Sequence, residues 1–266
     1  MRFFFFLSVA VVYTATLHAQ ELYVATEPAS NMPRHSIGIR LANEGMFQSD
    51  FKHRTNLEVM VGANKNLMLH GSAYLSDFYQ TDQKFEGLSF YGKYRFLSID
   101  GIQRHFRGAV FTRYSSVSNP LINEEINLEG DNSGIQAGLV LTQLIHKLGL
   151  SGSVSYTKAS DNRDFDLLSS QADESIGYTF SSGYLLFPKV YKDYGQTNLN
   201  LYLEFLGKSN PSRGENMMDI APAIQFIFNS KIRLDVSQRF QLWGNLNRTV
   251  ENMYLLRLEY NIFNAL

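Results

Sequence analysis

The sequence contains no cysteine, which excludes a disulfide scaffold, iron–sulfur ligation, thiol catalysis and an acyl-anchored lipoprotein amino terminus. The formal net charge is only −1, so no excess of either sign would attract nucleic acid or an anionic surface. Mean hydropathy is −0.18, too polar for a helical membrane protein. Tryptophan occurs once, yet there are 20 Phe and 15 Tyr, residues that favour β-strands.

The amino terminus has the pattern of a secretory signal. Met1 and Arg2 give a positive start, an apolar run covers residues 3–12, and Leu17, His18 and Ala19 form an exit of mostly small residues. The run is shorter than the roughly 20 residues of a membrane-crossing helix. We therefore predict a signal peptide at 1–19 that is cleaved after Ala19, followed by a single domain at 20–266.

Beyond residue 36 the apolar side chains recur at every second position, the period of a strand with one apolar and one polar face. A helical period is not sustained anywhere. About twelve segments show the alternation. They cover residues 37–41, 57–61, 67–75, 88–96, 106–114, 135–141, 148–156, 176–186, 199–205, 220–228, 232–242 and 254–262.

Short and long connections alternate between these segments, which distinguishes a membrane barrel from a soluble sandwich with the same period. The short ones are centred on 63–66, 100–101, 146–147 and 229–230, and the stretch 188–195 is longer than its place in the series prefers. The long ones cover 43–54, 77–86, 115–133, 158–174, 207–216 and 244–252. We predict an all-β, transmembrane, antiparallel up-and-down barrel in the outer membrane, with short periplasmic turns and long outer loops.

If the apolar positions face lipid, the residues between them face the lumen. The charged candidates number eight basic and five acidic side chains: Arg40, Glu58, Lys93, Arg95, Arg107, Arg113, Glu204, Asp219, Arg233, Asp235, Arg239, Arg257 and Glu259. Two interpretations are open. A cross-strand network of Arg40, Glu58, Arg257 and Glu259 would satisfy its own charges. A basic stripe of Lys93, Arg95, Arg107 and Arg113 would select anionic solutes.

No catalytic, cofactor-binding or metal-binding constellation is recognisable. His70 and His105 fall on inward positions without a serine in a nucleophile setting, so an outer-membrane lipid hydrolase is a remote alternative. No phosphate-binding loop and no zinc-ligand spacing occurs. Carboxylates at 123–131 and 161–166 fall on expected outer loops, where solvated side chains are commoner than a Ca²⁺ site.

Residues 87–96 (GLSFYGKYRF), 221–229 (APAIQFIFN) and 233–238 (RLDVSQ) resemble outer-membrane barrels of the Bacteroidota, similar to the phenol meta-degradation pathway transporter-like family. Residues 254–263 resemble the terminal assembly signal of such barrels. The resemblance implies a Gram-negative outer membrane, insertion by the barrel-assembly machinery, and transport.

The sequence therefore favours a passive, porin-like channel for a small-molecule solute, without cofactor and without nucleic acid. The alternative is a non-conducting structural or accessory barrel whose outer loops bind a partner, and its sign would be a lumen blocked by ion pairs.

Overall fold

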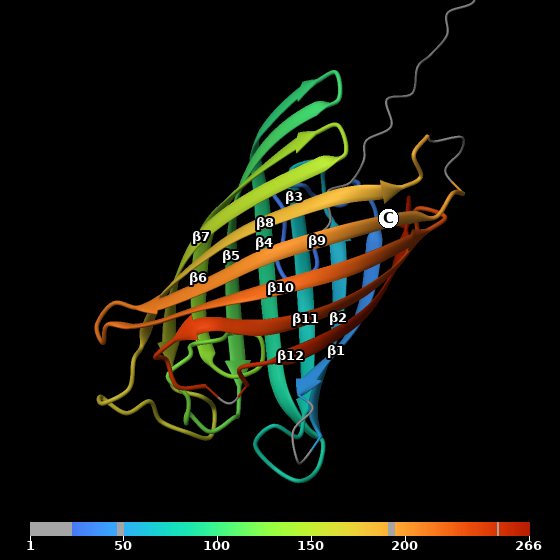
Figure 1. The fold of residues 1–266 in the computed structure, drawn as a ribbon. Coiled ribbons are helices and arrows are strands. Elements are labelled where there is room, and N and C mark those ends of the chain that lie inside the picture. Colours follow the sequence, from blue (N-terminus) through green and yellow to red (C-terminus); the bar gives the residue numbers. More distant parts are fainter. Residues whose placement is uncertain (1–22, 47–50, 191–194, 249) are drawn as a thin grey trace, which may run out of the picture.

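A computed structural model describes residues 23–46, 51–190, 195–248 and 250–266, so the predicted signal peptide at 1–19 lies outside the described residues. Twelve antiparallel strands in this part of the chain close into one barrel (Figure 1). Within these residues there is no helix with the length and apolar character needed to cross a membrane. The strands are β1 (Ile37–Met46), β2 (Lys52–Gly62), β3 (Leu67–Ser76), β4 (Lys84–Gly101), β5 (Arg104–Val117), β6 (Ser133–Ile145), β7 (Leu148–Ser160), β8 (Glu174–Phe187), β9 (Asn198–Asn210), β10 (Glu215–Phe228), β11 (Ile232–Gly244) and β12 (Met253–Ile262).

Each strand pairs with its neighbours in the sequence, and the first strand pairs with the last. The β1–β12 ladder begins with Ile37 opposite Ile262, passes through Arg40 opposite Glu259 and ends with Gly45 opposite Tyr254. Closure gives the strands hydrogen-bonding partners on both sides, which lipid could not supply at an open edge. The predicted twelve-stranded up-and-down barrel is confirmed.

The two faces of the wall differ in polarity as the period of two predicts. Along β4, Phe90 and Tyr94 are about half exposed on the outside, whereas Tyr91 and Lys93 are buried on the inside. Across the barrel, apolar side chains cover the outer face and charged side chains are buried. This arrangement is the reverse of a water-soluble protein, and it suits a wall that stands in lipid.

The barrel has one end with mostly short turns and one end with longer loops, and the carboxyl terminus lies at the short-turn end (Figure 1). We name the first the periplasmic end and the second the outer end. One predicted long connection is wrong. The 207–216 loop is a turn of residues 211–214, because β9 and β10 continue to Asn210 and Glu215 and Gly214 adopts a positive φ of 69°.

The predicted loop at 43–54 is also shorter than expected. Strand β1 continues to Met46 and β2 begins at Lys52, so Glu44 lies opposite Arg54 in the ladder. In the sequence, charged residues such as Glu44 and Arg54 interrupt the apolar alternation and were therefore assigned to a loop. In the structure they belong to the strands, and their side chains lie inside the barrel. Arg54 is consequently a buried wall residue.

Candidate functional site

The interior of the barrel is the candidate site, because the charged side chains gather there. Of the thirteen predicted lumen residues, ten are buried, and Arg95, Arg113 and Arg239 are partly exposed. They come from eight different strands, from β1 round to β12. Burial of so many charges is tolerated only where they are paired.

A chain of ion pairs runs along the inner face of the wall, from β2 through β1 and β12 to β11. Arg40 bonds Glu58 at 2.8 Å and Glu259 at 2.9 Å. Arg233 lies 3.0 Å from Glu259. Arg257 of β12, which was expected in this network, bonds Asp235 of β11 at 2.6 Å. Three residues of the cross-strand network considered from the sequence, Arg40, Glu58 and Glu259, are therefore ion-paired with one another, whereas the fourth, Arg257, pairs with Asp235.

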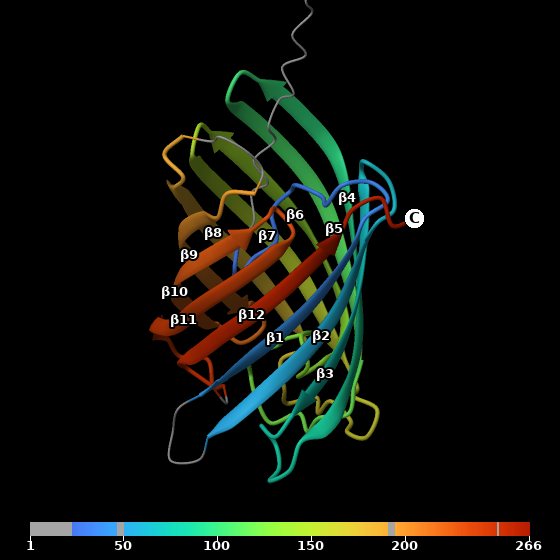
Figure 2. The same cartoon turned by 90° about the vertical axis from the view of Figure 1, so that its right-hand side faces the viewer.

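The interior also contains a segment that the sequence analysis did not place there. Residues 23–35, which we call the amino-terminal segment, lie within the barrel before β1 begins, and Figure 2 shows their blue trace inside the wall. The segment starts beside the middle of β9 and β12. Both oxygens of Glu204 accept hydrogen bonds from it, from the amides of Val24 and Ala25 and from the hydroxyl of Thr26. Arg257 donates to the carbonyls of Tyr23 and Val24.

Further along, the segment meets the basic residues of β1, β4 and β5. The Glu27 carboxylate lies between two cations, with Oε1 at 3.1 Å from Arg40 and Oε2 at 3.5 Å from Lys93. Lys93 also donates to the carbonyls of Pro28 and Ser30, at 2.6 and 2.8 Å. Arg107 donates to the Ser30 hydroxyl at 2.7 Å.

Apolar contacts complete the seating of the segment. Ala29 packs in a buried cluster with Ala109 and Val140, and its amide donates to the Thr142 hydroxyl at 2.8 Å. Nearer the periplasmic end, Met32 packs against Met60 and Met68. The segment therefore occupies the lumen from its middle to the periplasmic end.

The predicted basic stripe is divided among different partners. Lys93 and Arg107 face the segment, as described above. Arg95 donates to the Lys65 carbonyl at the periplasmic end. Arg113 pairs with Glu129 at 2.6 Å and lies over the Tyr91 ring. Lys93 and Arg107 therefore both bond Ser30 of the segment, whereas Arg95 and Arg113 bond residues elsewhere in the barrel.

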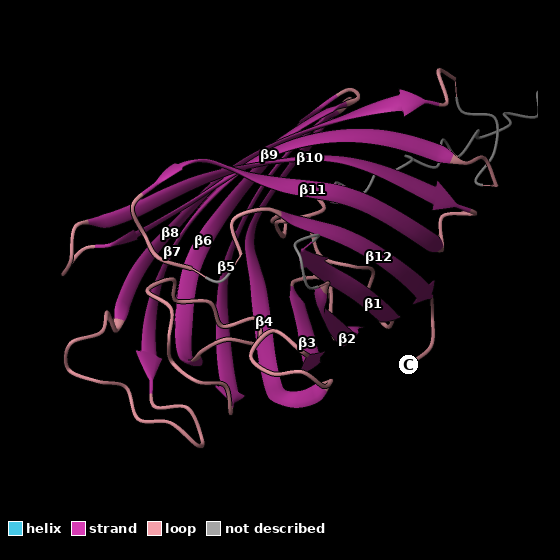
Figure 3. Ribbon diagram, turned by 60° about the horizontal axis from the view of Figure 1, so that its bottom comes forward, coloured by secondary structure: helices cyan, strands magenta, loops and turns pink. Residues whose placement is uncertain are grey.

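Loops lie across the outer opening of the barrel (Figure 3). Residues 118–132, the β5–β6 loop, bend inward and are latched by Arg54. This buried guanidinium bonds Glu86 at 2.7 Å, Asp131 at 2.5 Å and the Glu129 carbonyl at 3.1 Å. Asn119 ties the same loop to Glu86.

A second latch comes from residues 245–252, the β11–β12 loop. Arg248 makes a bidentate pair with Asp219, both bonds at 2.7 Å. A further ion pair holds the β5–β6 loop, in which Lys208 of β9 bonds Glu125 at 2.6 Å. Burial raises the pKa of Glu125, but the positive charges of Lys208, Arg239 and Arg248 outweigh it and lower that pKa to about 2. These carboxylates are thus held by internal cations.

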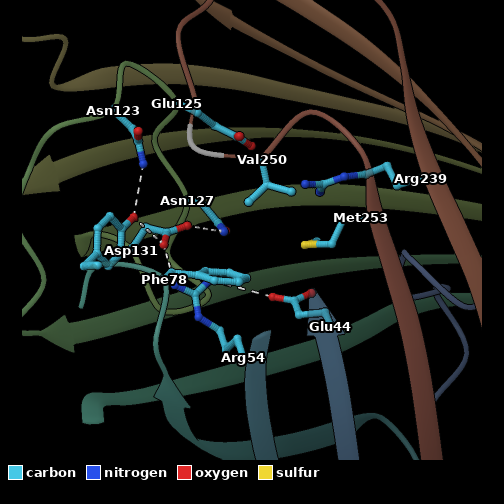
Figure 4. A pocket seen from close by; sticks show the side chains of 11 residues that line it. Glu44, Arg54, Phe78, Asn123, Glu125, Asn127, Asp131, Arg239, Val250 and Met253 are labelled. Atoms are coloured by element: carbon cyan, nitrogen blue, oxygen red, sulfur yellow. Dashed lines mark hydrogen bonds and ion pairs between the residues drawn. The ribbon is translucent and has the colours of Figure 1, made fainter. Parts of the chain in front are cut away.

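Between the latches is a small polar cavity of about 30 Å³, room for only a few water molecules (Figure 4). Glu44, Arg54 and Arg239 line it from the wall, and Glu125 and Asp131 line it from the β5–β6 loop. Charged side chains of the wall and of the β5–β6 loop therefore face one another at the outer mouth.

The two histidines considered for chemistry face carboxylates. Nδ1 of His70 lies 3.4 Å from Glu58, and its ring packs on Tyr91. Nδ1 of His105 lies 2.6 Å from Asp100 at the periplasmic end. Neither contact is that of a histidine activating a serine.

Sequence reasoning missed the amino-terminal segment, Arg54 and Arg248. The segment has no alternating period, so nothing in its pattern indicated where it lies. Arg54 and Arg248 fell on stretches expected to be loops. The one available signal was the run of seventeen residues, 20–36, between the predicted cleavage site and the first predicted strand, which is longer than a simple tether requires.

The fold is similar to those of known outer-membrane proteins. The COG4313 outer membrane channel from Pseudomonas putida F1 has a TM-score of 0.60 and 14% identity, covering 90% of this chain and 100% of that chain. The KdgM porin has a TM-score of 0.50 and 12% identity, covering 84% of this chain and 98% of that chain. No protein-family model and no curated protein matches the sequence.

At these identities the likeness concerns the fold. With the apolar outer face and the closed sheet, it identifies the chain as a β-barrel of the outer membrane, surrounded by outer-membrane lipid.

Proposed function

We propose that the barrel is a passive channel for a small solute, which conducts when the amino-terminal segment leaves the lumen. The observation that carries this proposal is the way the segment is held. No residue from 23 to 34 belongs to a strand, and its bonds to the middle of the wall are made to wall side chains. The segment can therefore leave without breaking a ladder of the barrel.

What the segment covers supports the same role. A twelve-stranded barrel is wider than the eight-stranded barrels that side chains fill, and narrower than the sixteen-stranded porins with open channels. Here the remaining width holds a terminal segment, and the wall behind it is charged. The solute passes along the thirteen charged lumen residues, whose mixed signs keep the path wet.

A removable cross-link tests the proposal. Ala29 and Ala109 are fully buried in one cluster, and the chain has no cysteine of its own. In planar bilayers we expect conductance from the unmodified protein. We expect the oxidised double variant Ala29→Cys/Ala109→Cys to be silent and to conduct again after reduction. The single variant Ala109→Cys is the control and should be indifferent to reductant.

Two outcomes would contradict the proposal. Absence of conductance from every form, under all salts and voltages, would show that the filled lumen is permanent and that the barrel is an accessory or structural protein. Undiminished conductance from the cross-linked form would show that solutes take a path that avoids the segment.

We also propose that the chain is exported by the signal peptide at 1–19 and inserted by the barrel-assembly machinery. The resemblance of residues 87–96 and 221–229 to the transporter-like barrels of the Bacteroidota supports this route. The intact mass of the protein from outer membranes tests it, since a mature chain starts at Gln20.

A further inference from the structure

We infer that Lys93 and Arg40 form a binding site for the carboxylate of a small solute, and that Glu27 of the amino-terminal segment occupies this site as an internal ligand. The inference rests on the proposed channel function and names the class of solute. Under it, the solute and the segment compete for the same two cations.

The partners of Lys93 are the first argument. Its ammonium is fully buried, and it has three donors to satisfy. Its two hydrogen bonds go to the Pro28 and Ser30 carbonyls and its ion pair goes to Glu27, all within the segment. In the described part of the chain, no wall residue bonds this ammonium. When the segment leaves, a wall cation is presented to the lumen with its donors unused.

The position of Glu27 is the second argument. Its two oxygens reach two cations from different strands, Arg40 on β1 and Lys93 on β4. Arg40 is held in place by Glu58 and Glu259, so its guanidinium remains oriented when Glu27 departs. A carboxylate bridging two buried cations is the geometry of a bound anion, and charge-assisted bonds make such contacts strong.

The remaining contacts show the same complementarity. The segment meets the wall cations with oxygen acceptors: carbonyls face Arg257, and the Ser30 hydroxyl faces Arg107. Glu27 is the only acidic residue between Tyr23 and Arg34. Its carboxylate is therefore the one charged group that a solute has to replace, while neutral oxygens can replace the rest.

The accessibility of one introduced thiol tests the competition. Ala29 is fully buried against Ala109 and Val140 of the wall, so Ala29→Cys in the full chain places a single thiol that a water-soluble maleimide reaches only after release of the segment. Sodium acetate is the probe, compared with sodium chloride at equal ionic strength. At a concentration of about twice its dissociation constant, acetate raises the released population, and hence the labelling rate, about threefold.

Variants assign the effect to the site. Adding Lys93→Met removes one of the two cations, and we expect labelling that no longer responds to acetate. Adding Lys65→Met changes an exposed lysine of the periplasmic turn, and the acetate response should persist. Adding Glu27→Gln weakens the internal ligand and should raise labelling without acetate. Heat-modifiable migration on gels checks that each barrel is folded.

Equal effects of acetate and chloride would overturn the inference, since screening alone would then release the segment. An acetate response that survives Lys93→Met would overturn it as well. Labelling does not require conduction, so the two proposals fail separately. Acetate-insensitive labelling in a conducting protein contradicts the carboxylate site alone, and acetate-sensitive labelling in a silent protein contradicts the channel alone.

Discussion

Gly62, the last residue of β2, decides whether the amino-terminal segment can enter the barrel. A Cβ at this position would lie 2.1 Å from the Pro33 carbonyl oxygen, a contact that backbone atoms cannot relieve locally. We expect Gly62→Ala to displace the segment and to lower the free energy of unfolding by about 1–3 kcal/mol, as overpacking does. Planar-bilayer recordings should show more frequent opening than in the unmodified protein.

Gly71 of β3 provides the matched control. A Cβ there would have its nearest neighbour, a ring atom of Phe90, at 3.9 Å, which is ordinary contact. Gly71→Ala should therefore leave opening frequency unchanged. If both variants behave alike, the close approach of Pro33 to β2 does not control the segment.

For single residues, the sequence predicted which side chains face the lumen better than it predicted which residues they bond. The inward positions of Arg40, Glu58 and Glu259 follow from the period of two, and their pairing follows from adjacency of β1, β2 and β12. The partners of Lys93 could not be predicted, because they lie on a segment without a period. Arg54 was assigned to a loop because the charges beside it interrupt the apolar alternation.

Among the elements, the β5–β6 loop depends on Arg54. The variant Arg54→Met would leave the buried carboxylate of Glu86 without its cation, a loss that costs roughly 3–5 kcal/mol for a buried pair. We expect the loop to swing free and its Glu124, Glu125 and Glu129 to become substrates for a glutamate-specific protease. Mass spectrometry of the fragments measures this. Arg104→Met, at an exposed periplasmic position, should leave the cleavage rate unchanged.

The Glu125–Lys208 latch on the same loop gives a pH dependence. Because the pKa of Glu125 is lowered to about 2, its stabilising contribution is complete above the unfolded value of about 4.3. That contribution is lost as the pH falls from there toward 2. Lys208→Met removes the largest of the opposing charges. The difference in unfolding free energy between the unmodified protein and Lys208→Met should be constant from about pH 7 to 5 and should shrink below that range.

Urea titrations at several pH values measure that difference. Lys189→Met, an exposed substitution, serves as the reference, and its difference from the unmodified protein should stay near zero throughout. A difference for Lys208→Met that shrinks already between pH 7 and 5 would mean that another group governs the latch.

For the molecule as a whole, the fold could be predicted because lipid imposes one rule on every strand. Outward positions must be apolar along the full span, so the alternation persists from β1 to β12. The connections, mostly short at one end of the barrel and mostly longer at the other, then indicate the topology. The contents of the lumen obey no such rule, since water, ion pairs and a folded-back segment all satisfy a polar wall. The positions of the amino-terminal segment and of the inward loops therefore could not be predicted from the sequence.

The same rule makes the outer face the place where one charge should do most harm. Val154 lies at the centre of β7 and is half exposed on the outside. Val154→Arg places a guanidinium near the bilayer midplane, where it lowers the free energy of unfolding by about 2–4 kcal/mol. Leu168→Arg adds the same charge in the β7–β8 loop, at a site with 61% exposure, and should change stability little. Urea unfolding in lipid vesicles compares the two. Equal losses, or a protein that stays monomeric in buffer without detergent, would mean that the apolar face does not meet acyl chains.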